Sequence, residues 1–242
     1  MSNKETIGIL STLSSPLLPL LMKMLQSRGL SNFIVIIDKK DFSIKDKKIW
    51  DERTSDKFNK NGLSAYDLKC KNCFYLVSDH NCDDCIDLIV NTGVTLLING
   101  GTPRKLIANV LNKPRRGIIN VHPGILPNYR GACCVEWAIL NNDQVGNTSH
   151  FMAEGYDDGP IIKIEKYRFP ANYDYNSIRT FVYEKSIELM ASSINTVLDN
   201  DMTPLDGIDQ EKGHLYKPIS EEQLTEVINK ISEGKYKYIE TK

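Results

Sequence analysis

Short, continuous apolar runs constrain the fold of this chain more than any other feature of its sequence. Turn residues follow each run, and a segment with helical apolar spacing comes next. Strands that are apolar on both faces are typical of parallel sheets covered by helices on both sides. The pattern therefore predicts an α/β fold, with a Rossmann-like, mostly parallel sheet and helices on both faces. The predicted strands are Thr6–Ser11, Phe33–Asp38, Phe74–Asp79, Val94–Gly100 and Gly117–His122.

Helical segments fill the gaps between these strands, and two further strands come later in the chain. The adjacent Cys133 and Cys134 are expected to be small buried residues at the start of another helix. The later strands are expected at Thr148–Ala153 and Ile161–Phe169. The predicted helices between the first strands are Pro16–Gly29, Asp46–Lys60, Cys85–Val90 and Lys105–Leu111.

A long helix is expected to begin after Asp174, whose side chain can accept hydrogen bonds from first-turn N–H groups, and to run to Asn200. Beyond Asn200 the composition turns polar. We therefore predict a main domain over residues 1–200 and a C-terminal extension over residues 201–242, with one helix at Glu221–Ile231. The apolar face of the long helix is predicted to comprise Ile178, Phe181, Val182, Leu189, Met190, Ile194, Val197 and Leu198.

The charge balance argues against two classes of partner. The chain has 242 residues and a formal net charge of −1. This gives no global attraction to nucleic acid or to an anionic membrane, so we expect neither as a partner. The first residues, MSNKETIGIL, lack the apolar core of a signal peptide, and no apolar run approaches the ~18 residues of a membrane span. We expect a cytoplasmic protein.

Two Cys-x-x-Cys pairs raise the question of a zinc site. Cys70 and Cys73 precede a predicted strand, and Cys82 and Cys85 follow it. A zinc knuckle normally joins its pairs through tight turns rather than through a core strand. We therefore predict reduced, packed thiols and no bound metal.

In an open parallel sheet, ligands bind beyond the carboxyl ends of the strands. This rule places the loops Ser11–Ser15, Gly100–Arg104 and Asn120–Gly124 along one edge. The first of these loops, STLSSP, lacks the glycines of dinucleotide-binding and phosphate-binding loops. Its hydroxyls suit either a ligand with several hydroxyl groups or the capping of the helix that follows.

Asn120 and His122 lie two residues apart at a strand end, so their side chains point to the same side. An amide can donate to a developing oxyanion, and an imidazole can exchange a proton near neutral pH. Asp157 and Asp158 lie in the turn EGYDDGP, and a carboxylate beside a histidine orients the ring and favours its protonated form. Taken alone, a structural Asn–His pair and an ordinary acidic turn are the simpler interpretations.

Together, the stretches NVHPGILP and YDDGP resemble the signature of the 10-formyltetrahydrofolate-dependent formyltransferases. Asn120, His122 and Asp157 match that signature in order and spacing. The resemblance covers Thr6–Asn200 in element order and is strongest over Gly117–Ile162. It implies the formyltransferase fold, a formyltransferase catalytic domain over residues 1–200, and N10-formyltetrahydrofolate as co-substrate, with no metal.

By this resemblance, Asn120, His122 and Asp157 are the catalytic residues. The amide and the imidazole would stabilise the oxyanion that forms when an amine attacks the formyl carbon, and Asp157 would orient His122 and help to take the amine proton. Asp158 matches a variable position and receives no role. The implied cofactor-binding residues are Arg104, Leu106, Ile118, Ala153 and Tyr156, and the substrate-binding candidates are Ser11, Thr12 and Arg130.

Three branches of this family differ in the amine that they formylate. The loop STLSSP departs from the glycine-rich phosphate loop of the glycinamide ribonucleotide branch. The methionyl-tRNA branch shares Arg-Gly-Ala but carries a larger C-terminal domain and a basic surface. The branch that formylates nucleotide-linked amino sugars shares Tyr-Arg-Gly and the following Trp137. We therefore favour an amino-sugar acceptor, for instance dTDP-4-amino-4,6-dideoxyglucose, in the synthesis of surface polysaccharide such as the O-antigen of lipopolysaccharide.

Other interpretations stay open at this point. They are a phosphoribosylglycinamide formyltransferase, a non-catalytic member that binds folate or a sugar nucleotide, and a folate-dependent hydrolase. Such hydrolases usually carry an extra domain before the first strand, whereas this sequence begins with that strand. The tail helix and the tyrosine-rich end are candidates for a homodimer contact.

Overall fold

The computed structural model describes residues 5–30, 32–55, 57 and 74–240. Its elements follow the alternation of strands and helices that the sequence predicts. The strands are β1 (Thr6–Ser11), β2 (Phe33–Asp38), β3 (Phe74–Val77), β4 (Val94–Asn99), β5 (Ile118–His122), β6 (Arg130–Gly131), β7 (Gly146–Phe151), β8 (Ile161–Lys166) and β9 (Leu215–Tyr216). The helices are α1 (Leu17–Ser27), α2 (Ile44–Thr54), α3 (Asp83–Asn91), α4 (Ala108–Leu111), α5 (Cys134–Leu140), α6 (Tyr175–Asp199), the 3₁₀ turn η2 (Pro204–Asp206) and α7 (Glu221–Ser232).

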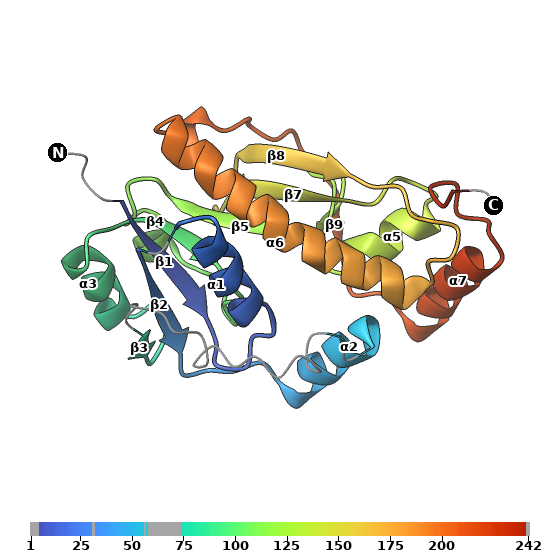
Figure 1. Cartoon of the computed structure of the whole chain (residues 1–242), viewed down its shortest axis with the longest axis horizontal. Helices are drawn as coiled ribbons and strands as arrows, with labels where there is room; N and C mark the ends of the chain where they lie inside the picture. The colour runs from blue at the N-terminus through green and yellow to red at the C-terminus, as the bar shows by residue number, and fades with distance from the viewer. Residues whose placement is uncertain (1–4, 31, 56, 58–73, 241–242) are drawn as a thin grey trace.

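A seven-stranded sheet with the order β3-β2-β1-β4-β5-β7-β8 forms the centre of the molecule (Figure 1). Neighbouring strands from β3 to β5 are parallel, and β7 is antiparallel to both β5 and β8. The predicted α/β fold with a mostly parallel sheet is therefore confirmed. A second, two-stranded sheet pairs β6 with β9, and the sequence pattern did not predict it.

Helices bury both faces of the central sheet. On β1, Ile7 and Ile9 pack in one cluster with α1 and α6, whereas Leu10 packs in another with α3 and α4. Successive side chains of a strand point to opposite faces, so a strand between two helical layers must be apolar throughout. A third cluster joins α5 and α6 to α7, where Val227 and Ile231 are buried, so the C-terminal extension contributes to the core of the molecule.

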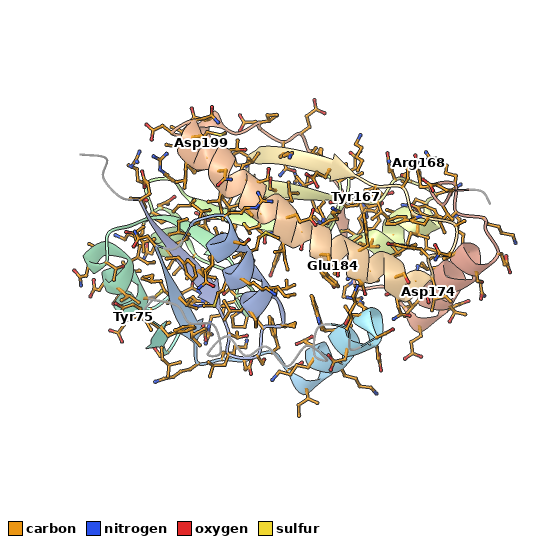
Figure 2. All side chains as sticks on the ribbon, viewed as in Figure 1. Tyr75, Tyr167, Arg168, Asp174, Glu184 and Asp199 are labelled. Atoms are coloured by element: carbon orange, nitrogen blue, oxygen red, sulfur yellow. The ribbon has the colours of Figure 1, made fainter. Side chains whose placement is uncertain are left out.

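The long helix α6 is capped as predicted, because the Asp174 side chain accepts a hydrogen bond from the Ser177 N–H. Figure 2 shows Asp174 and Asp199 at the two ends of this helix. Most of the predicted apolar face is buried, although Phe181 and Leu198 are only partly covered. No described helix is both long enough and apolar enough to cross a membrane.

The prediction of a helix over Lys105–Leu111 is partly wrong, because α4 begins only at Ala108. The side chain of Asn81 explains the difference. Its amide donates to the Lys105 carbonyl at 3.1 Å and accepts from the Ile107 N–H at 3.0 Å, which holds this stretch extended. A side chain from a separate loop thus satisfies the Lys105 carbonyl, which a longer helix would pair internally, and the Ile107 N–H, which it would leave unpaired.

The helix predicted over Asp46–Lys60 begins earlier, at Ile44, and ends at Thr54. Ser43 and Asp46 form a reciprocal capping box at its start, and Ser55 closes it in the left-handed conformation with a φ of 48°. Part of the predicted range lies outside the described residues.

Buried charges connect three helices behind the sheet. Glu136 on α5 is fully buried and lies 3.6 Å from Arg53 on α2 and 3.5 Å from Arg179 on α6. The Tyr175 hydroxyl also donates to Glu136 at 2.6 Å. Burial alone would raise the pKa of Glu136, but Arg179 and Arg53 outweigh it and lower the pKa. One buried carboxylate therefore holds two guanidinium groups together, of which Arg179 is buried and Arg53 is partly exposed.

Replacing Glu136 by Gln is expected to lower the free energy of unfolding by about 3–5 kcal/mol, because it leaves the buried Arg179 and the partly buried Arg53 without a counter-charge. Urea unfolding followed by circular dichroism measures this change. The matched control is Glu184→Gln, which removes an exposed ion pair with Lys57 and should cost less than about 1 kcal/mol. Equal effects of the two substitutions would show that the buried triad does not hold the helices together.

Candidate functional site

Antiparallel pairing sets the centre of the site. Asn120 on β5 lies directly opposite His150 on β7, so the two side chains share one face of the sheet. The Asn120 Nδ2 is 3.1 Å from the His150 Nε2. The other ring nitrogen, Nδ1, lies 2.8 Å from the Phe151 carbonyl and must donate to it, which leaves Nε2 as the acceptor in the neutral ring.

A chain of amides fixes the orientation of Asn120. The Asn99 Oδ1 accepts from the N–H groups of Gly101 and Thr102 at 3.0 and 2.9 Å. The Asn99 Nδ2 therefore faces the Asn120 Oδ1 and donates to it at 2.9 Å. With its oxygen occupied, Asn120 directs its NH₂ group toward His150 and retains one N–H for a ligand.

Asp157 comes from the loop that follows β7, here called the Asp157 loop (residues 152–160). The loop closes on itself, because the Phe151 N–H donates to the Pro160 carbonyl at 2.8 Å. Gly159 is required at this closure, since a Cβ there would lie 1.9 Å from the Phe151 carbonyl oxygen. Asp157 itself has a φ of 51°, in the left-handed region that non-glycine residues rarely adopt.

The Asp157 carboxylate lies between two imidazoles. Its Oδ2 is 3.3 Å from the His122 Nδ1 and accepts from the Gly131 N–H at 3.0 Å, and its Oδ1 is 3.6 Å from the His150 Nε2. The structure thus brings together Asn120, His122 and Asp157, the three residues predicted to be catalytic. Burial alone would raise the pKa of Asp157, but His150, His122 and the Gly131 N–H outweigh it and lower the pKa to about 2.

His122 lies behind the carboxylate rather than on the open side of the site. It is 4% exposed, and its Nε2 donates to the Tyr129 carbonyl at 2.8 Å. Burial lowers the pKa of His122, while Asp157 acts in the opposite direction. A protonated His122 ring could donate one N–H to Asp157 and the other to the Tyr129 carbonyl, so these two acceptors together suit an imidazolium.

His150 is a residue of this cluster that the sequence analysis assigned to a strand but gave no role. A single histidine in a buried strand is usually a core residue, and its neighbours across the sheet are unknown until the strands are paired. No local signal in the sequence singles out His150, because only the antiparallel register places it opposite Asn120.

A cavity of about 370 Å³ opens over the cluster, lined by Asn120, His150 and Asp157. Predicted cofactor-binding residues form much of the remaining wall. Arg104, Leu106, Ala153 and Tyr156 line the cavity, whereas Ile118 is buried behind it and its carbonyl accepts from the Met152 N–H at 2.7 Å.

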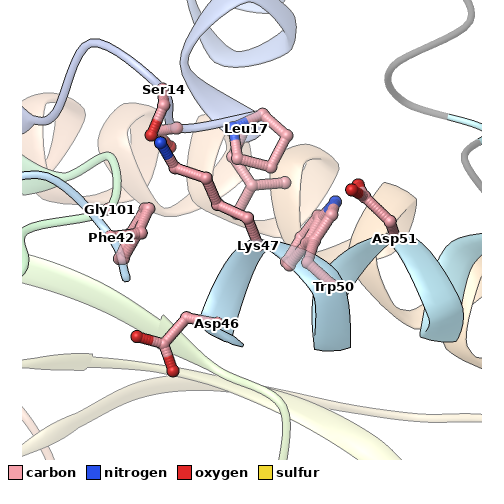
Figure 3. Close-up of a pocket in the computed structure, with 10 residues that line it drawn as sticks. Ser14, Leu17, Phe42, Asp46, Lys47, Trp50, Asp51 and Gly101 are labelled. Carbon is pink, nitrogen blue, oxygen red and sulfur yellow. The ribbon is translucent and has the colours of Figure 1, made fainter. Parts of the chain in front are cut away.

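A second cavity of about 310 Å³ lies between the loop after β1 and helix α2 (Figure 3). Ser14 and Ser15 form one side, and Trp50 forms part of the other. Gly101 also lines this cavity, and the adjacent Thr102 lines the first one, so the loop after β4 separates the two.

The predicted substrate-binding residues lie beside these cavities without lining either. The Ser11 hydroxyl is buried and donates to the Gly100 carbonyl at 2.7 Å. Thr12 is also buried, and its hydroxyl has no hydrogen-bond partner among the described residues. The Arg130 guanidinium donates to Gln210 in the C-terminal extension at 3.0 Å.

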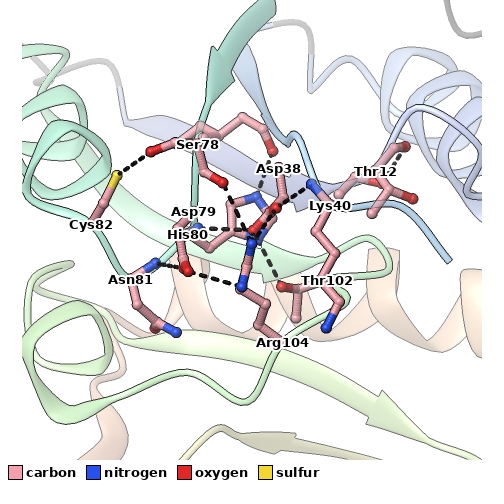
Figure 4. A network of polar contacts seen from close by, with 12 residues as sticks. Thr12, Asp38, Lys40, Ser78, Asp79, His80, Asn81, Cys82, Thr102 and Arg104 are labelled. Carbon is pink, nitrogen blue, oxygen red and sulfur yellow. Dashed lines mark hydrogen bonds and ion pairs between the residues drawn. The ribbon is translucent and has the colours of Figure 1, made fainter.

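The Arg104 side chain is held by carboxylates from two other strand ends (Figure 4). Its Nε lies 2.6 Å from Asp38, the last residue of β2, and its Nη1 lies 2.9 Å from Asp79 after β3. Burial alone would raise the pKa of Asp38, but Arg104 and nearby backbone N–H groups lower it overall. These pairs anchor the loop that forms the wall of the first cavity, so Arg104 contributes its position rather than a free charge.

The described cysteines make no metal cluster. Cys82 and Cys85 are free thiols near the start of α3, and within the described ranges no three His, Cys, Asp or Glu side chains come together as a metal-binding group. Cys70 and Cys73 lie outside the described residues, so the prediction that the paired motifs bind no zinc stays a prediction.

Comparison with known proteins identifies the family to which the chain belongs. Residues 8–194 match the model of the family described as formyl transferase. A methionyl-tRNA formyltransferase from Clostridium tetani is 32% identical over 107 residues, which span 44% of this chain and 34% of that relative. The chain thus matches about a third of the length of that curated relative.

Solved structures share the fold at low sequence identity. A sugar N-formyltransferase from a Shewanella species has a TM-score of 0.61 at 17% identity, covering 90% of this chain and 78% of that one. A glycinamide ribonucleotide transformylase from Symbiobacterium toebii has a TM-score of 0.60 at 17% identity, and the match covers 87% of this chain and 96% of that chain. These two structures show the fold and leave the acceptor open.

The substitution Asp157→Asn is expected to cost about 2 kcal/mol of folding free energy at pH 7, from a pKa lowered from 3.8 to about 2. Because the folded state lowers the pKa, this stabilisation is present above about pH 4 and is lost as the pH falls toward 2. Urea unfolding at a series of pH values should show the gap between wild type and variant closing over that window. Asp158→Asn, a change to the exposed neighbour, is the control and should stay within about 0.5 kcal/mol. A gap that does not change with pH would contradict the assignment.

Proposed function

The chain belongs to the formyl transferase family, and we propose that it transfers the formyl group of N10-formyltetrahydrofolate to the amino group of a nucleotide-linked amino sugar in the cytoplasm. The product would serve surface polysaccharide synthesis, as in the O-antigen of lipopolysaccharide. The observation that carries the proposal is the cluster of Asn120, His150, Asp157 and His122 at the first cavity, with a second cavity on the other side of the loop after β4. A transfer between two substrates needs such an arrangement.

The residues suit direct attack of an amine on a formyl carbon. A bond forms between the amine nitrogen and the formyl carbon, the bond from that carbon to the folate N10 breaks, and the amine loses a proton while N10 gains one. The Asn120 amide has an N–H available for the oxyanion that develops at the formyl oxygen. Asp157, ionised at neutral pH, can accept the amine proton directly or through water.

In the conformation described, His122 supports this step from behind Asp157. Its two nitrogens contact the carboxylate and the Tyr129 carbonyl, so it can stabilise charge on Asp157. The direct contact with the oxyanion that the family resemblance implies would require the ring to leave the Tyr129 carbonyl. His150 lines the cavity, but its Nδ1–H is bonded to the Phe151 carbonyl, so this ring could donate to the oxyanion only with a second proton on Nε2.

We assign the first cavity to the folate. Its wall combines the apolar Leu106 and Met152 with backbone of the Asp157 loop, which suits a flat heterocycle with donors and acceptors on its edge. Tyr156 is 59% exposed at the entrance, with the Lys105 ammonium 5.1 Å from its ring centre. That ammonium suits the acidic tail of a folate.

We assign the second cavity to the acceptor. Trp50 and Phe42 offer aromatic surface for the apolar face of a sugar or for a base, and Asp46 and Asp51 provide carboxylates that can bind hydroxyl groups. The loop after β1 presents Ser14 and Ser15 to this cavity and carries no glycine-rich anion nest. The lining supports a sugar acceptor better than a terminal phosphate.

Sequence similarity raises a tRNA acceptor as the alternative. The matched relatives are methionyl-tRNA formyltransferases, but only about a third of such a relative is matched, and the present chain has a net charge of −1. A protein that binds a tRNA backbone needs a basic surface. The alternative is therefore included in the test of the acceptor.

A mass-spectrometric screen tests the acceptor. The purified protein is offered N10-formyltetrahydrofolate with a panel of amino-sugar nucleotides, glycinamide ribonucleotide or methionyl-tRNA, and a gain of one formyl group is the readout. We expect at least one amino-sugar nucleotide to be used about a hundredfold more efficiently than glycinamide ribonucleotide, a difference of about 2.7 kcal/mol in transition-state binding. Comparable or better use of glycinamide ribonucleotide or methionyl-tRNA would overturn the proposed acceptor.

Replacing Asn120 or His122 by Ala should lower kcat by about two to three orders of magnitude, as expected when a donor or its support is removed from an oxyanion site. Steady-state kinetics on the acceptor found in the screen measures this loss, with circular dichroism to show that the fold survives. Asn128→Ala, an exposed asparagine in the loop after β5, is the matched control and should retain wild-type kcat. Near-normal turnover of His122→Ala would remove this residue from the mechanism.

A further inference from the structure

The C-terminal segment from η2 through β9 contacts the loop after β5 and the Asp157 loop, which carry the residues of the cluster. Ile208 exchanges two backbone hydrogen bonds, of 2.7 and 2.8 Å, with Ile161 at the end of the Asp157 loop. Further along, the Tyr216 carbonyl of β9 accepts from the Ala132 N–H at 3.1 Å, beside the paired strand β6. Figure 1 shows this segment leaving the end of α6 and returning to β9. It therefore joins the loop after β5 to the loop that carries Asp157.

Gln210 lies in this segment and bonds to both loops at once. Its Nε2 donates to the carbonyls of Asp157 and Gly159, at 3.1 and 2.5 Å. Its Oε1 accepts from Arg130, at 3.3 Å from Nε and 3.0 Å from Nη2. Because a carbonyl cannot donate and a guanidinium cannot accept, the orientation of the Gln210 amide is fixed.

These bonds act on a residue that needs support. Asp157 has a left-handed backbone conformation, with a φ of 51°, which non-glycine residues rarely adopt. The carbonyl that Gln210 holds belongs to the same residue as the carboxylate that faces His122 and His150. Fixing that carbonyl limits the rotation of the Asp157 backbone and thus the position of its carboxylate.

The same segment also supports the acceptor of the His122 ring. Tyr216 stacks on Tyr129, with ring centres 5.1 Å apart and an interplanar angle of 7°. The Tyr129 carbonyl is the group to which His122 donates. Both contacts of the imidazole therefore rest on residues that the C-terminal segment holds.

We propose that Gln210 is a positioning residue for catalysis, which holds the Asp157 carboxylate against His122 by binding the carbonyls of Asp157 and Gly159 and the guanidinium of Arg130. The inference rests on formyl transfer at this cluster and is independent of the acceptor. It predicts that the C-terminal extension completes the active site rather than only adding to the core.

Two substitutions of Gln210 separate positioning from packing. Gln210→Met keeps the length of the side chain and removes both sets of bonds. Gln210→Glu keeps the acceptor for Arg130 but places a carboxylate oxygen against two carbonyls. The matched control is Gln223→Glu at the start of α7, where the side chain accepts from the Ser220 N–H and a carboxylate can do the same.

The main readout is the titration of the His122 imidazole, followed by NMR of protein with ¹⁵N-labelled histidine and no substrate present. The chain has four histidines, so the ring signals can be assigned individually. Asp157 favours protonation of His122, so we expect Gln210→Met to lower the pKa of that ring further, and kcat to fall at least about tenfold. Gln223→Glu should change neither.

An unchanged His122 titration together with kcat within about twofold of wild type would overturn the proposal. So would a large drop in the thermal midpoint with an unchanged His122 titration, because it would show that Gln210 only packs. If Gln210→Met does not fold, Gln210→Glu decides by the same imidazole readout. Since the imidazole titration is done without substrate, an error in the proposed acceptor would appear in the screen and would not alter the titration.

Discussion

The register between β5 and β7 is the constraint on which the rest of the site depends. It sets Asn120 opposite His150, and a shift of one residue would turn one of the two side chains to the other face of the sheet. From this pair the amide chain runs through Asn99 to the loop after β4, which separates the two cavities. One antiparallel strand in an otherwise parallel sheet thus links this cluster to the walls of both cavities.

The site combines two opposing electrostatic effects. Burial disfavours charge on His122, and the same burial strengthens the interaction of this ring with the Asp157 carboxylate. The carboxylate keeps its charge because two imidazoles and a backbone N–H compensate for lost water. In the proposed reaction, the proton of the attacking amine would enter this cluster at Asp157, which lines the cavity, with the buried His122 behind it.

Much of the fold and part of the site could be predicted from the sequence, because those features depend on short, continuous stretches of residues. Apolar runs identified the strands of the central sheet, and the Asp174 cap marked the start of α6. Asn120, His122 and Asp157 could be selected because they lie in two short stretches with a recognisable spacing. Their grouping in space agrees with that selection, and their roles remain proposals.

The rest depends on contacts between distant parts of the chain. Arg104 and Asp38 are 66 residues apart, and nothing near either residue indicates that the guanidinium is already paired. His150 can be assigned to the site only when its pairing with Asn120 on β5 is known, and Gln210 is one polar residue in a polar tail. The pairing of β6 with β9 could not be predicted either, because two-residue strands carry no periodicity.

The path of the C-terminal segment has a consequence for the order in which the molecule is made. Gln210 follows Asp157 by 53 residues, so the ribosome synthesises β8 and all of α6 before Gln210 can bond to the Asp157 loop and to Arg130. Once the strands of the central sheet have left the ribosome, the nascent chain already contains each amide, imidazole and carboxylate of the cluster. Under the proposed role of Gln210, the cluster reaches its final geometry only after this later segment has also been synthesised.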